Sequence, residues 1–300
     1  MPTASPLFSI IIPTYNRAHL IGDTIESVLQ QGFSDFEVLI VDDGSKDNTE
    51  EKVKKFSDDR LHYFKMENVE RGAARNFGLR NSRGTYVNFF DSDDLYYPCL
   101  SAVSEFVLNN GIPYVVYGDI DNLAPDGSVV KGQTLPYSSF RENILFNNFL
   151  ACGSVFLKRE VAKDFPFSDD RRLSGSEDWE LWLRLYAEFD FQRIPITIFK
   201  QRQHSERSLI TADAERVTER EKLFAKLISE HRTILRKRFS DNEINLLMAD
   251  RMTLIALTQF VGGNRKLCFH YWRQSFRLSV RVLKRRRFLA VAKKLMFERL

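Results

Sequence analysis

Val87-Asn-Phe-Phe-Asp-Ser-Asp-Asp94 is an apolar run that ends abruptly in three acids, Asp91, Asp93 and Asp94. Carboxylates two positions apart at a strand end can face one hard cation. Mg²⁺ or Mn²⁺ binds through one or two such groups together with substrate phosphates. The same residues also suit an ordinary turn or a helix cap. The motif therefore predicts a strand end, and it leaves a metal site and a structural turn both open.

Two other segments of the chain share this form. They are residues 8–17, Phe-Ser-Ile-Ile-Ile-Pro-Thr-Tyr-Asn-Arg, and residues 36–45, Phe-Glu-Val-Leu-Ile-Val-Asp-Asp-Gly-Ser. Short apolar runs alternate here with amphipathic ones, which predicts a parallel sheet covered by helices. The expected strands are 7–13, 36–42, 61–65 and 85–91, and the expected helices are about 18–31, 47–57 and 72–81. Because ligands gather beyond the carboxyl ends of parallel strands, we expect Asp42, Asp43, Asp91 and Asp93 to share one crevice.

The remaining sequence predicts a second half of this domain and a helical region after it. Strands are expected at 114–119 and 153–158, and a helix is expected to begin at Glu177-Asp178-Trp179. From about residue 213 the pattern predicts helices at 213–239, 241–261 and 265–298, with Gly262-Gly263 as a break. We therefore predict a domain of residues 1–210, with halves of about 7–110 and 111–210, and a helical extension of residues 211–300.

Five motifs in order give the chain a resemblance to the family 2 glycosyltransferases over about residues 7–205. They are Ile-Pro-Thr-Tyr-Asn-Arg (12–17), Val-Asp-Asp-Gly-Ser (41–45), Arg-Gly-Ala-Ala-Arg-Asn (71–76), Asp-Ser-Asp-Asp (91–94) and Glu-Asp-Trp (177–179). The resemblance implies an α/β fold of the GT-A type, with a mostly parallel central sheet flanked by helices. It implies inverting, metal-dependent sugar transfer from a nucleotide-diphosphate donor, expected to carry UDP. The expected acceptor is a hydroxyl of a glycan or lipid-linked saccharide in bacterial-type surface polysaccharide synthesis.

The same resemblance assigns roles to individual residues. Asp178 matches the catalytic base, and Glu177 and Trp179 would position the acceptor. The cation, Mn²⁺ or Mg²⁺, would be held by Asp93, Asp91 and His204. The residues expected to bind the nucleotide sugar are Pro13, Tyr15, Asn16, Asp42, Arg71, Asp91 and Arg202. Glu177 and Asp178 also suit the free N–H groups of a helix start, and a single loop histidine is often only solvent-exposed.

Composition and charge predict where the protein is located and what its basic C-terminal tail contacts. With no secretory signal, no CxxC pair and no uninterrupted apolar stretch of membrane-spanning length, we expect a cytoplasmic protein, peripheral on the inner face of the plasma membrane. Residues 265–300 carry a net charge of +11 and the remainder −7. This basic, aromatic-containing tail suits an anionic membrane surface, a helix packed on the catalytic domain, or a homodimer contact. Nucleic acid is not an expected partner, because no nucleic-acid motif accompanies the charge.

Two alternatives to an active glycosyltransferase remain open on the sequence. A sugar nucleotidyltransferase would share an α/β nucleotide fold, but Pro13-Thr-Tyr-Asn-Arg17 occupies the place of its Gly-rich loop. A degenerate nucleotide-sugar-binding subunit would recruit a partner through the basic tail. The absence of GxGxxG after the first strand and of GxxxxGK[ST] disfavours a Rossmann dinucleotide site and a P-loop.

Overall fold

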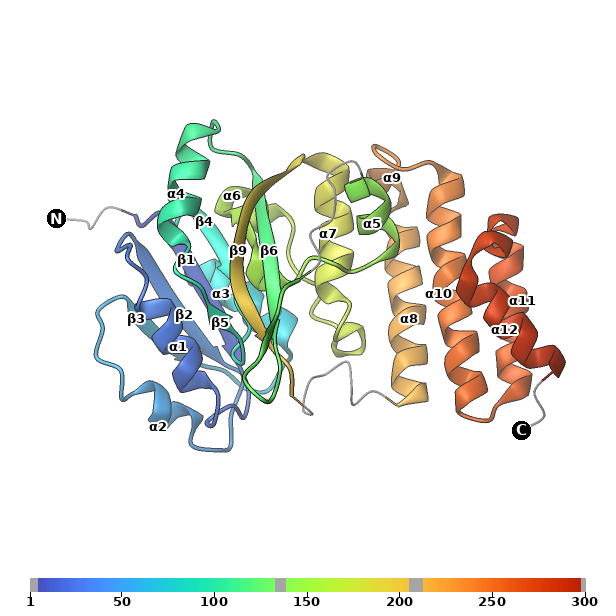
Figure 1. The fold of residues 1–300 in the computed structure, drawn as a ribbon, viewed down its shortest axis with the longest axis horizontal. Coiled ribbons are helices and arrows are strands. Elements are labelled where there is room, and N and C mark those ends of the chain that lie inside the picture. The colour runs from blue at the N-terminus through green and yellow to red at the C-terminus, as the bar shows by residue number, and fades with distance from the viewer. Residues whose placement is uncertain (1–4, 133–138, 205–212, 298–300) are drawn as a thin grey trace. The chain divides into compact units, whose positions relative to one another are not determined.

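The computed structural model describes residues 5–132, 139–204 and 213–297 (Figure 1). These residues divide into two compact units. Unit 1 contains the described residues of Met1–Phe140, Phe149–Arg171 and Phe189–Ser205, and unit 2 contains those of Arg141–Asn148, Arg172–Glu188 and Glu206–Leu300. Two short segments before residue 210 thus belong to the same unit as the C-terminal helices.

Unit 1 is built on one sheet, which has nine strands in the described residues. The strands are β1 (Phe8–Thr14), β2 (Phe36–Asp42), β3 (Leu61–Lys65), β4 (Tyr86–Phe89), β5 (Leu95–Tyr96), β6 (Val115–Leu123), β7 (Val129–Val130), β8 (Val155–Lys158) and β9 (Phe191–Arg202). Its helices are α1 (Ile21–Leu29), α2 (Thr49–Val53), α3 (Arg71–Asn81), α4 (Leu100–Asn109) and α6 (Arg159–Asp164), with a 3₁₀ turn at Cys152–Ser154. The strand order is β3-β2-β1-β4-β8-β6-β9-β5, and β7 pairs with β6.

The first four strands form the predicted parallel block. Phe8 lies opposite Phe36 on one side and Tyr86 on the other, and Thr14 lies opposite Asp42. Every residue of β1, β2 and β4 is buried, as continuous Val, Ile and Phe runs predict for strands covered on both faces. The strands predicted at 36–42 and 61–65 are confirmed, and the other two agree within two residues.

Beyond β4 the sheet is mixed rather than parallel. Strand β8 runs antiparallel to β4 and β6, whereas β6 and β9 run parallel to each other. Strand β9 also pairs antiparallel with the short strand β5, with Leu95 opposite Lys200. This last pairing brings the end of β9 to the acids that follow β4.

A buried carboxylate joins the two central strands at their amino ends. Ser9 Oγ donates to Glu37 Oε1 over 2.7 Å, and the Arg83 backbone N–H donates to the same oxygen over 2.6 Å. Arg83 Nε donates to Glu37 Oε2 over 2.9 Å. Burial raises the pKa of the Glu37 carboxyl, but these hydrogen bonds outweigh burial and hold the pKa below its ordinary value.

Unit 2 is helical. Its helices are α5 (Phe140–Phe146, whose first residue belongs to unit 1), α7 (Glu177–Glu188), α8 (Ala214–Glu230), α9 (Arg232–Leu235), α10 (Asp241–Val261), α11 (Arg265–Leu278) and α12 (Arg286–Phe297), with 3₁₀ turns at Arg171–Leu173 and Val280–Lys284. Helices α8, α10, α11 and α12 enclose an apolar core that includes Ile255, Phe260 and Val291.

The predicted single helix over 265–298 is wrong, because the chain breaks between α11 and α12. Ser279 and Arg285 both have extended backbone angles, and a 3₁₀ turn lies between them. The turn lets Val282 and Phe288 pack with Ala249 of α10 in one buried cluster. A straight helix would not bring both side chains to the same partner. The break predicted at Gly262-Gly263 is confirmed, and Gly263 has a φ of +80°.

Helix α10 alone, within the described residues, is long and apolar enough by length and mean composition to cross a membrane. Asp250 and Arg251 interrupt its apolar sequence. Two thirds of its apolar window, 67%, is buried inside the protein. It begins at a capping box in which Ser240 and Glu243 exchange hydrogen bonds. These features are typical of the central helix of a bundle.

The buried carboxylate leads to a stability prediction. We expect Glu37→Gln to lower the free energy of unfolding at pH 7 by about 1–3 kcal/mol, because an amide cannot accept at both former oxygens. The stabilisation is complete above the ordinary carboxyl pKa of 4.5 and is lost as the pH falls through the lower pKa of the folded state. Urea unfolding at several pH values measures this.

The matched control for this prediction is Glu51→Gln, which changes an exposed carboxylate on α2. A gap between Glu37→Gln and wild type that stayed constant from pH 7 to below pH 4 would contradict the role given to the ionised Glu37.

Candidate active site

The candidate site of unit 1 lies at the carboxyl ends of the parallel strands. Strands β1 and β2 end side by side at Thr14 and Asp42, and the acids at 91–94 follow neighbouring β4. The Asp43 backbone N–H donates to Thr14 O, and the Phe90 N–H donates to Ile11 O, each over 2.9 Å. The expected convergence of Asp42, Asp43, Asp91 and Asp93 on one edge of the sheet is therefore what the topology produces.

The loop after β1 is tied to the loop after β2. Asn16 has a φ of +51°, in the left-handed region that asparagine tolerates better than most residues. Its backbone N–H donates to Ser45 Oγ over 2.9 Å, and its side-chain Oδ1 accepts from the Lys46 N–H over 2.8 Å. Tyr15 beside it is 40% exposed, whereas Pro13 is buried in β1. Asn16 thus fixes the loop that presents Tyr15.

Asp42 is completely buried, and both of its oxygens accept hydrogen bonds from the protein. Oδ1 accepts from the Ser45 N–H over 2.7 Å, and Oδ2 accepts from the Tyr63 hydroxyl over 2.6 Å. Burial, reinforced by this bond to Asp42, raises the pKa of the Tyr63 hydroxyl above its ordinary value. A nucleotide base would have to use a second lone pair of one of these oxygens.

Asp43 has a structural task that the sequence did not reveal. Its carboxylate accepts from the backbone N–H groups of Val69 and Glu70 over 2.8 and 3.0 Å, respectively. Burial raises the pKa of Asp43 above its ordinary value, although these hydrogen bonds oppose the rise. Glu70 has a φ of +144°, a strained value for a residue with a side chain, and it immediately precedes Arg71 at the start of α3. Asp43 thus holds a strained turn in front of Arg71.

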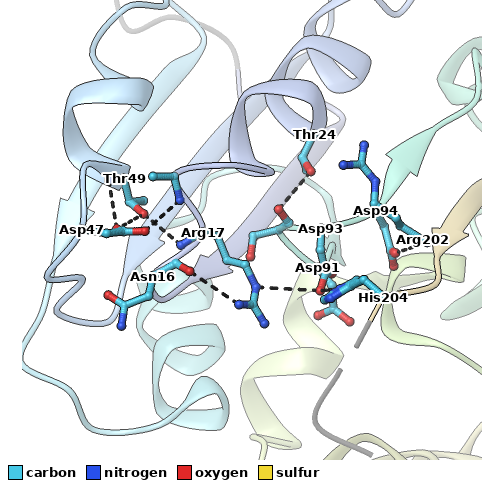
Figure 2. A network of polar contacts seen from close by, with 12 residues as sticks. Asn16, Arg17, Thr24, Asp47, Thr49, Asp91, Asp93, Asp94, Arg202 and His204 are labelled. Atoms are coloured by element: carbon cyan, nitrogen blue, oxygen red, sulfur yellow. Dashed lines mark hydrogen bonds and ion pairs between the residues drawn. The ribbon is translucent and has the colours of Figure 1, made fainter. Parts of the chain in front are cut away.

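The three acids after β4 differ in their partners, and Figure 2 shows Asp93 with His204 and Arg17, and Asp94 with Arg202. Asp91 Oδ1 accepts from Arg75 Nη2 over 2.8 Å, and Asp93 Oδ2 lies 2.9 Å from His204 Nε2. Asp94 is buried and accepts the Arg202 backbone N–H over 2.9 Å. Asp94 therefore fixes the end of β9, while the carboxylates of Asp91 and Asp93 are more exposed than that of Asp94.

Two arginines lie next to these acids, Arg75 beside Asp91 and Arg202 beside Asp94. Arg75 is 2% exposed, and its guanidinium carbon lies 5.1 Å from the centroid of the Phe167 ring. Its contact to Asp91 makes it a residue that orients a predicted ligand, a role that the sequence did not reveal. The side chain of Arg202, predicted to bind the nucleotide, donates to Asp23 Oδ2 over 2.8 Å.

Asp93 and His204 fit a divalent cation that takes its other ligands from a nucleotide. The described residues contain no group of three or more His, Cys, Asp or Glu side chains arranged for a metal. However, Asp93 and His204 already touch, and His204 Nδ1 is buried without a hydrogen-bond partner in the described part of the chain. A carboxylate and an imidazole suit Mn²⁺, and phosphates usually supply further oxygens. Asp91 is held toward Arg75 instead.

A buried hydroxyl at the same edge was missed by the sequence analysis. Thr14 is 3% exposed, and among the described residues its Oγ1 has no hydrogen-bond partner. It ends β1 next to Asp42. Only its position in Pro-Thr-Tyr-Asn could have drawn attention to it, because a threonine at a strand end is otherwise ordinary.

The Glu-Asp-Trp motif belongs to unit 2 and begins α7. Asp178 Oδ1 accepts from Asn148 Nδ2 over 2.9 Å and from the Trp179 N–H over 2.7 Å. Glu177 is buried, and its Oε2 accepts from the Gly175 N–H over 2.6 Å. Both carboxylates thus bind backbone N–H groups at the helix start, as the structural alternative predicts. Asp178 remains half-buried, whereas Glu177 is enclosed.

Comparisons with known proteins agree with the fold and with the motifs. The chain matches the family "Glycosyl transferase family 2" over residues 9–163. It is 34% identical over 193 residues to the Escherichia coli UDP-Glc:alpha-D-GlcNAc-diphosphoundecaprenol beta-1,3-glucosyltransferase WfgD, covering 63% of this chain and 73% of that protein. It is 30% identical over 220 residues to an uncharacterized glycosyltransferase of Rickettsia bellii, covering 69% of this chain but only 31% of the relative.

Among solved structures, the Staphylococcus aureus TarS fragment 1–349 in complex with UDP-GlcNAc is similar to the chain. Its TM-score is 0.67 at 20% sequence identity, covering 96% of this chain and 88% of TarS 1–349. This likeness and the mixed sheet confirm the expected GT-A fold. The family match over half of the chain and the similarity to WfgD show the family directly. The chain belongs to the family 2 glycosyltransferases.

Proposed function

We propose that the protein is an inverting, metal-assisted glycosyltransferase. It would transfer a sugar from a UDP-linked donor to a hydroxyl of a lipid-linked glycan during synthesis of a bacterial surface polysaccharide. The observation that carries this proposal is the convergence of Asp42, Asp91 and Asp93 on one edge of the β2-β1-β4 sheet, in a chain of this family. The acceptor class is proposed because WfgD is named for a diphosphoundecaprenol-linked acceptor.

The donor would bind in unit 1. Tyr15 would stack on the uracil, because its ring is exposed at the end of a loop that Asn16 holds rigid. Asp42 would accept from the base with its remaining lone pairs, and the hydroxyl of Thr14 would find a partner there. Arg71 and Arg202 would neutralise the diphosphate, Arg71 from a turn that Asp43 fixes.

Asp93 and His204 would hold the cation directly, and Asp91, oriented by Arg75, would contact the ribose or a water on the metal. When bound, the cation neutralises the charge that develops on the leaving diphosphate.

The reaction would be a single displacement. Asp178 takes the proton of the acceptor hydroxyl while that oxygen forms a bond to the anomeric carbon. The bond between that carbon and the diphosphate oxygen breaks, and its electron pair leaves with the nucleoside diphosphate. Attack on the opposite face inverts the anomeric centre. Asn148 and the Trp179 N–H, which bind Asp178 Oδ1, would orient the carboxylate for this task.

The outer face of α11 is proposed to contact an anionic bilayer, where the lipid-linked acceptor resides. Phe269, Arg273 and Phe276 follow one another at helical spacing, with the two phenylalanines 51% and 41% exposed. Lys266 and Arg277 are exposed as well, whereas Cys268, Tyr271 and Ser275 of the same helix are buried. Exposed aromatic rings among cations are typical of helices at the membrane interface. The protein would accordingly be a cytoplasmic, peripheral protein of the inner membrane face.

The first prediction concerns the base. Asp178→Asn should lower kcat about 10²- to 10⁴-fold, because the acceptor hydroxyl loses its proton acceptor. Donor affinity, measured by calorimetry with UDP and Mn²⁺, should stay unchanged. Glu142→Gln, which alters an exposed acid on α5, is the control. Wild-type kcat in Asp178→Asn, or loss of UDP binding at normal kcat, would refute this role.

The second prediction concerns the donor site. Titration with UDP, dTDP, GDP and CDP should show tight binding of UDP with Mn²⁺ and much weaker binding with EDTA. Asp93→Asn should weaken UDP binding in Mn²⁺ by about tenfold or more, because a metal ligand is lost. Asp35→Asn, an exposed acid before β2, should bind like wild type. Equal UDP affinity with and without metal would exclude the cation from donor binding, and binding without any sugar transfer would favour the degenerate subunit.

The third prediction concerns the α11 face. Arg273→Glu/Arg277→Glu should reduce binding to phosphatidylglycerol vesicles by at least about tenfold, since each cation near such a surface contributes about 1 kcal/mol. Lys163→Glu, exposed on α6, should bind like wild type. Unchanged vesicle binding in the double variant would contradict the proposed membrane contact. A wild-type dimer that the double variant turns into a monomer, seen by light scattering, would assign the face to a second copy of the chain.

A further inference from the structure

Trp179, the residue after Asp178, is held on several sides within unit 2. Its ring is 3% exposed, and its indole Nε1 donates to the Ile144 carbonyl oxygen of α5 over 2.7 Å. The Phe224 ring of α8 lies 4.7 Å from it, centroid to centroid. The guanidinium carbon of Arg251 on α10 lies 4.7 Å from the centre of the indole. A cation at this distance from a tryptophan ring is attracted to it, and the attraction grows when water is excluded.

Arg251 is a buried charge that needs anionic partners. It is 6% exposed and donates to Asp250 Oδ2, while its Nη1 lies 3.5 Å from Glu221 Oε2. Asp250 and Glu221 are themselves 2% and 1% exposed. A buried ion pair keeps its geometry only when both charges stay compensated, because an unpaired buried charge is costly. The position of Arg251 over Trp179 therefore depends on what compensates Asp250.

The basic C-terminal tail supplies that compensation. Arg287 Nη1 of α12 donates to Asp250 Oδ2 over 2.8 Å, and Arg285 Nε lies 3.8 Å from Asp250 Oδ1. In contrast, Arg286 between them is exposed. The tail charges thus divide into inward-directed and outward-directed arginines, which the charge count alone did not distinguish.

A second path leads from the tail to Asp178. The guanidinium carbon of Arg285 lies 4.2 Å from the centre of the Phe146 ring, at the end of α5. Two residues later Asn148 donates its side-chain N–H to Asp178 Oδ1 over 2.9 Å. The carboxylate and the residue after it are thus supported from two directions, and both supports rest on arginines of the tail.

We propose that Arg251 is a positioning residue for Asp178, and that Arg285 and Arg287 complete the buried ion network that holds it in place. Arg251 touches neither donor nor acceptor in this scheme and acts through Trp179. The inference rests on the proposed function, in which Asp178 is the base. It gives the C-terminal helices a part in turnover that is separate from any membrane contact, because a base misplaced by about 1 Å can lose about a hundredfold in rate.

The test compares Arg251→Lys, Arg287→Gln and the neighbouring control Arg286→Gln, using the full chain, a detergent-dispersed lipid-linked acceptor and no vesicles. Lysine keeps the charge but lacks the planar guanidinium that lies over Trp179 and reaches two acids. We expect kcat to fall about tenfold or more in Arg251→Lys and severalfold in Arg287→Gln. The Kd for UDP with Mn²⁺ should be unchanged, since donor binding belongs to unit 1. Arg286→Gln should match wild type in both quantities.

The outcomes separate this inference from the proposed function. Wild-type kcat in both Arg251→Lys and Arg287→Gln would overturn the inference and leave the proposed function standing. A parallel fall of kcat, UDP affinity and Tm would also overturn it, because a general loss of structure explains that pattern. If Arg251→Lys failed to fold, the kcat of Arg287→Gln against Arg286→Gln would decide. A wild-type protein that binds UDP but transfers no sugar would overturn the proposed function itself, and the inference with it.

Discussion

The in-register parallel pairing of β2, β1 and β4 is the constraint on which unit 1 depends. These strands are buried on both faces, so a shift of one residue would exchange the side chains that face each covering layer. The Glu37 carboxylate secures this register at the amino ends by binding Ser9 and Arg83. With the register fixed, Thr14 and Asp42 must finish side by side, and the acids after β4 must follow next to them.

Helix α3 packs very closely against the backbone at Ser168 in unit 1. A Cβ at Gly72 would lie 2.2 Å from the Ser168 carbonyl oxygen, so only glycine fits there. This approach also puts Arg75 against Phe167 and Asn76 against the Phe167 backbone. The orientation of Asp91 therefore depends on a segment 76 residues later in the chain, which contacts Arg75 of α3 and also packs on Phe89 of β4.

Much of unit 1 could be predicted from the sequence, because each of its first strands corresponds to a short, continuous run of apolar residues. An apolar run that ends in Asp42, and another that ends before Asp91, set both the strands and the edge at which they finish. The role of Asp43 could not be predicted, because a second acid in a turn looks the same whether or not it holds a distant loop. Arg75 was missed for the same reason, since its burial depends on Phe167. In the tail, Arg285 and Arg287 differ from Arg286 only through tertiary packing, which a charge count does not contain.

The pairing of β9 with β5 has a consequence for the order in which the protein is made. Asp93 meets His204 across 111 residues, and Asp94 meets Arg202 across 108. The parallel strands β1, β2 and β4 are complete once residue 89 has been synthesised, whereas these contacts must wait until β9 has left the ribosome. Closing so long a loop costs chain entropy that only later packing repays. The nascent chain therefore passes through a stage in which the acids at this edge have been synthesised and their partners Arg202 and His204 have not.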